Sequence, residues 1–290
     1  MGKKGKRAQA GKPKKPTPKD IGKRLDALAK RLEEELEGVD LFAPLPPTED
    51  CPICLVPLSR VAKNSGYWGC CGNMICAGCD AENQALLKRQ SKPDTCPFCR
   101  ELSPSSDGEY VRQLEARALK NDHVALRNLG CSFEAGFFGL QGSPVPQDYL
   151  KALDYLIRAV ELGSPEACDT IGTCYSEGKG VSKDMDRKAL FFTVGSLRGC
   201  ISARHNIGCS EYNSGNHEIG IRHWKIAAEA GSQPSIDTLK KIYNANGKMP
   251  GKEFISKERM DSIYRVGHDA QEEVKSEARE KHFYDVDMKC

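Results

Sequence analysis

The chain has 290 residues, of which 39% are hydrophobic and 29% charged, and its mean hydropathy is −0.54. No apolar run approaches the roughly 20 residues that a membrane-spanning helix needs, so we expect no helical membrane anchor. The net charge of +3 is small for this length, which argues against a strongly basic nucleic-acid-binding protein. A chain of this size predicts about two domains.

Positive charge is concentrated at the start of the chain. Residues 1–20 hold eight Lys or Arg and one Asp, so the remainder is net negative. The segment is rich in Lys, Gly and Pro and has little to bury, which predicts a disordered tail. It could serve nuclear import or loose contact with an acidic polymer, or simply keep the chain soluble. We expect no nucleic-acid partner except through this tail.

Residues 21–38 predict an amphipathic helix, because apolar residues recur on one face and charges on the other. Two heptads are too few for a coiled coil, so we expect the helix to pack on the cysteine-rich stretch that follows or to mediate self-association. Residues 39–50 are a proline-rich linker, and Phe42-Ala-Pro-Leu-Pro-Pro within it should be stiff. The apolar face of the helix is formed by Ile21, Leu25, Leu28, Leu32 and Leu36.

Residues 51–100 contain eight of the chain's 14 cysteines. Three of their four pairs have two intervening residues, a spacing that lets both thiolates reach one metal ion. Since tetrahedral zinc takes four ligands, eight cysteines predict two structural zinc sites. A disulfide framework would need a secreted chain, but the first 20 residues lack the apolar core of a signal peptide. We therefore expect a reducing intracellular compartment, the cytoplasm or the nucleus, and no secretion.

The order Cys-Pro-Ile-Cys, Cys-Gly-x-x-Ile-Cys-x-x-Cys and Cys-Pro-Phe-Cys-Arg resembles a RING-type zinc finger. In that family the first and third ligand pairs hold one zinc ion and the second and fourth pairs hold another, in a cross-brace. The family pattern has a His where this chain has Asn73. Because a neutral amide is a poor zinc ligand beside thiolates, we expect Cys70 to supply the missing ligand. The resemblance thus implies one site of Cys51, Cys54, Cys76 and Cys79 and a second of Cys70, Cys71, Cys96 and Cys99.

RING fingers generally act as ubiquitin ligases, and the resemblance implies that activity here. They hold a ubiquitin-conjugating enzyme charged with ubiquitin in a reactive pose, so no covalent catalytic residue is expected. Ile53 would offer an apolar contact, Pro97 would shape the facing loop, and Arg100 would bridge the enzyme and ubiquitin with its fork of donors. Packing on the zinc core is the alternative for Ile53, and a solvated charge for Arg100. We expect Tyr67 and Trp68 in the core of this small domain.

A helix is expected over residues 80–89, and a linker over residues 101–108, where Ser103-Pro-Ser-Ser-Asp-Gly marks a domain boundary. Helix resumes at about residue 109.

Residues 109–279 are organised by repetition. Ala125–Gly130, Ala167–Gly172 and Ala203–Gly208 align at intervals of 42 and 36 residues. A period of this length with two amphipathic helices per unit indicates a helical solenoid. The units, with the Gly178-Lys-Gly turn, resemble Sel-1-like repeats, relatives of the tetratricopeptide type.

Helix punctuation supports this division. Gly163 and Gly231 suit positions just after helix ends, while Asp148, Asp184 and Ser164 suit N-caps. The first unit departs from the pattern by a longer loop at residues 137–146, and the motif decays after residue 232, as a terminal capping unit would. Residues 280–290 form a tail.

The sequence therefore predicts a mainly α protein, with a small two-zinc RING domain followed by a solenoid of Sel-1-like repeats. No catalytic motif falls in the repeats, and we expect them to bind a protein substrate or complex on a concave surface. The alternative function is a non-catalytic, zinc-binding interaction scaffold. The cysteines of the repeats should be small buried apolar residues: Cys131, Cys168, Cys174, Cys200 and Cys209.

Overall fold

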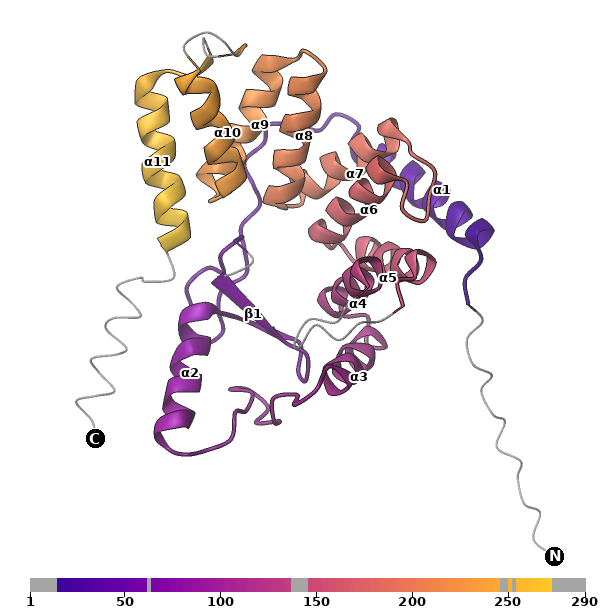
Figure 1. Cartoon of the computed structure of the whole chain (residues 1–290), viewed down its shortest axis with the longest axis vertical. Helices are drawn as coiled ribbons and strands as arrows, with labels where there is room; N and C mark the ends of the chain where they lie inside the picture. The colour runs from indigo at the N-terminus through magenta and orange to yellow at the C-terminus, as the bar shows by residue number, and fades with distance from the viewer. Residues whose placement is uncertain (1–14, 62–63, 137–145, 246–249, 252–253, 273–290) are drawn as a thin grey trace, which may run out of the picture.

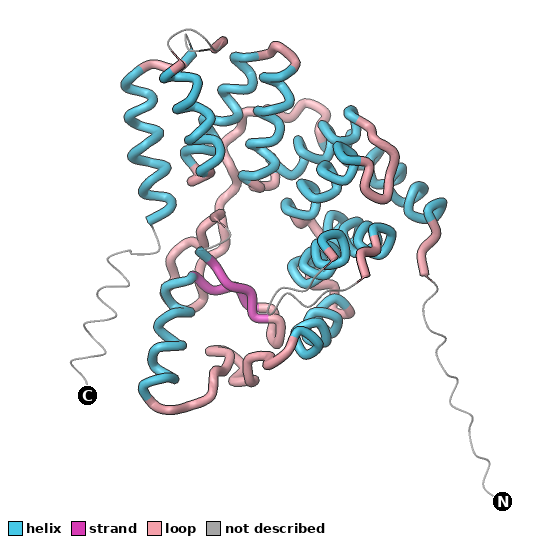
Figure 2. The backbone as a smooth tube through the Cα atoms, in the orientation of Figure 1, coloured by secondary structure: helices cyan, strands magenta, loops and turns pink. Residues whose placement is uncertain are grey.

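The computed structural model describes residues 15–61, 64–136, 146–245, 250–251 and 254–272. Most of the basic tail, most of the long loop and the C-terminal tail that we expected lie outside these residues. Within them the protein is mainly helical, as expected, with one two-stranded sheet (Figure 2). No helix of the described part is both long and apolar enough to cross a bilayer.

Helices α3 to α11 form a curved array (Figure 1). Helix α3 precedes the tightly packed helix pairs α4–α5, α6–α7 and α8–α9; α10 packs on α9, and α11 contacts both α9 and α10. Their bounds are α3 Asp107–Ala118, α4 His123–Ala135, α5 Tyr149–Glu161, α6 Pro165–Glu177, α7 Met185–Leu197, α8 Ile201–Asn213, α9 His217–Glu229, α10 Gln233–Asn244 and α11 Lys257–Glu272.

The expected helix punctuation is confirmed at five positions. Asp148, Ser164 and Asp184 cap α5, α6 and α7, because each side chain accepts a hydrogen bond from a backbone N–H in the first helical turn. Gly163 and Gly231 follow helix ends at φ 93° and 90°, in the left-handed region that glycine adopts without a steric penalty. Local signals in the sequence therefore set where these helices begin and end.

Helix α1 (Pro18–Glu35) belongs to the core of the repeats. It starts earlier than expected because Thr17 and Asp20 form a reciprocal capping box. Its apolar face packs against α5 and α7, and not on the cysteine-rich stretch, so this face is also not free for self-association. Ion pairs flank the contact: Arg24–Asp154, Arg31–Glu161 at 3.2 Å, Asp26–Arg187 at 2.7 Å and Glu35–Arg198 at 2.8 Å.

Residues 51–100, which we call the cysteine-rich module, have little regular structure. Strands β1 (Ser65–Trp68) and β2 (Asn73–Cys76) pair antiparallel, with Ser65 opposite Cys76 and Trp68 opposite Asn73. Helix α2 (Ala77–Arg89) follows directly. It starts three residues before the expected Asp80, because the Cys76 thiol caps it by accepting from the Cys79 N–H at 3.4 Å.

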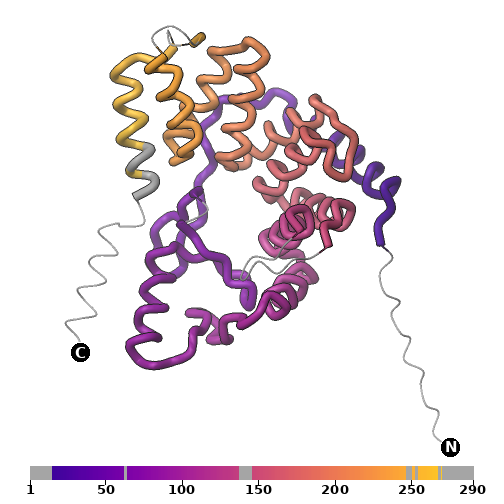
Figure 3. Tube along the Cα trace, in the orientation of Figure 1, coloured from indigo at the N-terminus to yellow at the C-terminus, as the bar shows by residue number. Residues whose placement is uncertain are grey.

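Residues 36–50, the connecting segment, join α1 to the module. Figure 3 shows the segment running alongside the repeat helices before it reaches the module, which lies on the open side of the curve. The module and the first turns of α4, α6, α8 and α10 line a cleft of about 1070 Å³. The two halves of the chain therefore face each other.

Candidate metal centre

The structure brings the eight cysteines of the module together in two groups of four. Within each group all sulfur atoms lie within 4.8 Å of one another. The groups interleave along the chain, because the first and third pairs meet in one and the second and fourth pairs in the other. The first group contains Cys51, Cys54, Cys76 and Cys79, and the second contains Cys70, Cys71, Cys96 and Cys99.

The spacing of the sulfurs suits a tetrahedral ion better than a disulfide. Zn–S bonds of about 2.3 Å place two ligand sulfurs about 3.8 Å apart in a tetrahedron, whereas a disulfide needs about 2.05 Å. The Sγ atoms of Cys54 and Cys76 are 3.8 Å apart, and those of Cys71 and Cys96 are 3.6 Å apart. All eight cysteines are free thiols. Two four-thiolate sites for a soft, tetrahedral ion such as zinc therefore fit the residues present.

Two equivalent turns shape the first and last cysteine pairs. In Cys51–Leu55 and Cys96–Arg100 the fifth residue donates its N–H to the carbonyl of the first, at 2.8 and 3.1 Å. Leu55 and Arg100 adopt φ 59° and 63°, a left-handed conformation that costs a non-glycine residue about 1–2 kcal/mol. Such strain persists only where surrounding structure over-determines it, and four sulfurs on one ion would do so.

The third pair lies at the start of α2. Cys76 precedes the helix and accepts the Cys79 N–H at 3.4 Å, and Cys79 lies in the first turn. Burial acts to raise the pKa of Cys51, but the N–H groups of Cys76, Cys54 and Ile53 outweigh it and bring that pKa to about 7. Burial raises the pKa of Cys79, and the adjoining Cys76 thiol adds to the effect. The thiols of the group therefore differ in pKa, and metal binding would release the protons that they carry.

The second pair, Cys70 and Cys71, sits in the turn between β1 and β2. The N–H groups of Cys71 and Gly72 both point to the Trp68 carbonyl, at 3.3 and 2.7 Å, and Gly72 has φ 84°. This turn lets adjacent cysteines face the same group. Asn73 donates its side-chain N–H to the Cys71 sulfur at 3.3 Å, so it serves as a hydrogen-bond donor to a sulfur and not as a ligand.

The module is fixed to the repeats through Asp122, the N-cap of α4. Tyr67 on β1 donates its hydroxyl to Asp122 Oδ2 at 2.9 Å, and Arg117 Nε donates to the same oxygen at 2.9 Å. The Arg117 guanidinium also covers Gly72, where a side chain would collide with it. Tyr67 therefore packs against the core of the repeats, and the expectation that it belongs to the module's own core is wrong; Trp68 does pack there.

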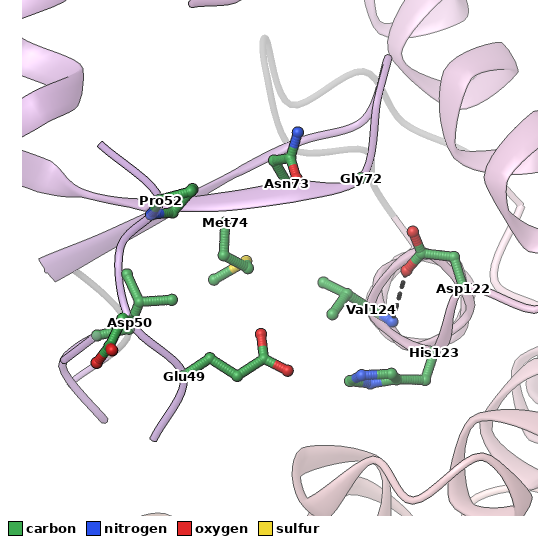
Figure 4. A pocket seen from close by; sticks show the side chains of 10 residues that line it. Glu49, Asp50, Pro52, Gly72, Asn73, Met74, Asp122, His123 and Val124 are labelled. Carbon is green, nitrogen blue, oxygen red and sulfur yellow. Dashed lines mark hydrogen bonds between the residues drawn. The ribbon is translucent and has the colours of Figure 1, made fainter. Parts of the chain in front are cut away.

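A pocket of about 360 Å³ opens beside this contact (Figure 4). Glu49 and His123 extend into it from opposite sides, the first from the connecting segment and the second from the start of α4. Met74 of β2 and Asp122 also line it, and Asp122 accepts from the Val124 N–H at 3.1 Å. The pocket marks the seam between the module and the repeats.

The Tyr67→Phe change should loosen the module without unfolding either half. It removes one hydrogen bond to a charged carboxylate, an interaction that contributes about 1.5–3 kcal/mol. We expect faster amide hydrogen exchange in residues 65–76 and unchanged exchange in α6 to α9. The Tyr149→Phe variant, in the repeats, is the matched control and should leave both regions as in the wild type.

The residues expected to face a conjugating enzyme lie at the surface. Ile53 is 37% exposed, Arg100 is exposed, and Pro97 is partly exposed. None of the ion pairs among the described residues involves Arg100. Leu55, two residues after Ile53, is an apolar side chain that is 74% exposed. Sequence reasoning missed this exposure, for which its position directly after the second cysteine was the available signal.

Comparison with known proteins identifies the repeats. The model of the family described as Sel1 repeat matches residues 123–164, 165–192 and 203–232. No curated protein matches the chain. Among solved structures, a Sel1 repeat protein from Oxalobacter formigenes is 24% identical with a TM-score of 0.48, over 65% of this chain and 71% of that one. An immunity protein from Pseudomonas aeruginosa is 16% identical with a TM-score of 0.36, over 68% and 85%. Residues 123–192 and 203–232 of this chain are therefore Sel1 repeats.

Proposed function

We propose that the chain is a RING-type ubiquitin ligase, in which the cysteine-rich module recruits a charged conjugating enzyme and the Sel1 repeats hold a protein substrate. The observation that carries the proposal is the interleaving of two four-thiol groups, together with an exposed arginine, Arg100, directly after the last cysteine. Interleaved sites would lock the two turns of the module to each other. The zinc ions would supply structure only, since no step of the reaction needs a nucleophile on this chain.

In this proposal the chain acts by positioning. Ile53 and Leu55, on the first turn, would give the conjugating enzyme an apolar contact, and Pro97 would shape the second turn. Arg100 would hold the enzyme and ubiquitin together, because a guanidinium can donate to two acceptors in a fixed plane. Restricting the thioester to a reactive pose is what would accelerate the transfer to a lysine. Thiolate zinc sites persist in a reducing compartment, so we place the protein in the cytoplasm or the nucleus.

A second function, a zinc-stabilised interaction scaffold without transferase activity, is supported by one observation. Asn73 occupies the place of the family's histidine and donates to the Cys71 sulfur, so the second site differs from the usual ligand set. Sel1 repeats suit a protein-interaction scaffold in either case. The two functions differ in whether Arg100 matters for ubiquitin transfer.

Autoubiquitination by the zinc-loaded chain, with a panel of conjugating enzymes, tests the proposal. We expect the wild type to be active and Ile53→Ala and Arg100→Ala to lose about tenfold or more, since misplacing reacting groups has effects of this size. Lys92→Ala, which removes an exposed cation of the same module, is the control and should retain activity. Equal activity in all four proteins would refute the assigned docking surface. Inactivity with every conjugating enzyme, from protein that holds two zinc ions, would favour the scaffold.

A further inference from the structure

The repeats bind the connecting segment through its main chain and one aromatic side chain. Arg204 on α8 is fully buried, at 0% exposed, and its guanidinium donates to the Leu41 carbonyl at 2.5 Å and to the Ser196 carbonyl at 3.3 Å. Leu41 lies 163 residues away in the chain. The repeats thus hold the main chain of a distant, irregular segment through a buried cation.

The side chain that follows is held as well. Phe42 is half-buried, with its ring 3.7 Å from the Arg222 guanidinium carbon and 4.8 Å from the His223 ring. A cation over an aromatic face is attracted by the ring quadrupole. Helix α9 therefore binds an aromatic side chain between a guanidinium group over its face and a neighbouring imidazole ring.

A second anchor holds the proline-rich end of the segment. Arg60 of the module donates to the Pro46 carbonyl and, at 3.0 Å, to the Gly199 carbonyl. Gly199 lies in the short connection between α7 and α8. Gly199 has φ 107°, and a side chain there would meet both Pro46 and Arg60. Arg204 and Arg60 thus bind two carbonyls, and α9 binds one aromatic ring, over six residues. Leu41 and Phe42 lie in a turn closed by the Ala43 N–H on the Asp40 carbonyl at 3.1 Å, and residues 43–49 have no regular structure.

The receptor surface is not fully satisfied by this segment. Arg204 makes no ion pair with a carboxylate among the described residues, and its Nε atom and the Nδ1 atom of buried His223 have no hydrogen-bond partner there. Burial lowers the pKa of Arg204 to about 10, with Asp40 opposing the shift, and lowers that of His223 to about 4, with Arg204 and Arg222 adding to the effect. Buried polar atoms without partners favour a ligand that can pair with them.

We propose that the face of α8 and α9 formed by Arg204, Arg222 and His223 is a peptide-binding site, which residues 41–46 occupy as a built-in competitor. The ligand in trans is a segment of a protein partner with an aromatic residue in a turn, followed by prolines. Prolines pre-set an extended backbone, so little conformational entropy is lost on binding. This inference concerns binding alone and stands whether or not the module transfers ubiquitin.

Competition follows from the covalent link. A tethered segment acts at an effective concentration in the millimolar range, so it keeps the site filled. The apparent affinity for a free ligand is then reduced to the fraction of molecules whose site is open. Weakening residues 41–46 should therefore strengthen binding of the same peptide added from outside.

The test uses a fluorescent synthetic peptide of residues 38–49 and the full-length, zinc-loaded chain. Relative to the wild type, Phe42→Ala should bind the peptide about tenfold tighter, because the open fraction rises. Val39→Ala is the matched control: Val39 is 40% exposed in the same segment, and its truncation should leave the affinity as in the wild type. Equal affinity in all three proteins would show that the segment is a tether only and would overturn the proposal.

Changes on the receptor side separate this site from nonspecific capture. In the Phe42→Ala background, adding Arg222→Gln should reverse the gain, whereas adding Lys241→Gln, an exposed cation of α10, should not. If both added changes abolish the gain in affinity, the peptide binds through general positive charge, which would contradict the proposal. Size-exclusion chromatography of the same proteins should show monomers. A dimer that dissociates when the peptide is added would mean that the site binds a second copy of the chain and not a partner protein.

Discussion

Replacing Cys76 by serine should unfold the cysteine-rich module and leave the repeats folded. Cys76 supplies a sulfur to the first group and caps α2, so one change removes a ligand and a helix start. The apolar cluster of the module is small and consists largely of cysteines, and it offers little to replace the metal. Structural zinc sites contribute apparent free energies of about 10–16 kcal/mol at neutral pH, so loss of a ligand should exceed what such a core can offset.

Zinc content and amide hydrogen exchange measure this effect. The variant should hold fewer than two zinc ions and lose protection throughout residues 65–89, while α4 to α9 keep theirs. Cys131→Ser in the repeats is the matched control, because Cys131 lies outside both four-thiol groups and its sulfur is 3.6 Å from Thr170 Oγ1. A Cys76→Ser protein with two zinc ions and full protection would contradict the assignment of this group as a metal site.

Replacing Gly220 by alanine should destabilise the solenoid by about 3 kcal/mol, the upper end of the range for overpacked cores. Gly220 lies on α9 where it crosses α8, and a Cβ atom there would lie 2.7 Å from the Gly208 carbonyl oxygen and 2.9 Å from the Tyr212 nitrogen. These are main-chain atoms, so no side-chain rotation relieves the clash and the two helices must separate.

Thermal unfolding followed by circular dichroism checks this prediction. A loss of about 3 kcal/mol lowers the melting temperature by about 6–12 °C in a chain of this size. Gly22→Ala on α1 is the matched control, since no atom lies within 4 Å of the added Cβ; it should be neutral or raise stability by up to about 1 kcal/mol through helix propensity. Equal melting temperatures for the two variants would show that α8 and α9 are not in close contact.

Periodic signals in the sequence are what made the repeats predictable. The recurring glycines at 130, 172 and 208 mark the unit length, and the structure supplies their reason: a side chain at Gly172 would meet Phe192 at 2.6 Å, and one at Gly208 would meet Trp224 at 2.5 Å. The starts of α5, α6 and α7 were equally readable, because an N-cap acts within three residues of itself. Sequence reasoning succeeded where the cause and the effect are close in the chain.

The position of α1 and the contacts of Arg204 could not be predicted for the opposite reason. An amphipathic helix of 18 residues fits any apolar groove, and only the assembled solenoid shows that α5 and α7 provide it. Nothing in the sequence marks Arg204 as buried, because its acceptors are main-chain carbonyls that carry no sequence signature. Tyr67 was likewise expected in the core of the module, but its hydroxyl donates to Asp122, the N-cap of α4.

The most direct test of the central claim is single-turnover discharge of ubiquitin from a preformed conjugating-enzyme thioester onto free lysine. It isolates transfer from substrate binding, so neither the repeats nor the connecting segment enters the result. We predict that the zinc-loaded chain accelerates discharge and that Arg100→Ala brings the rate back to about that of the thioester alone. A rate with the wild type equal to the rate without it, across the conjugating enzymes tried, would contradict the ligase and leave the interaction scaffold.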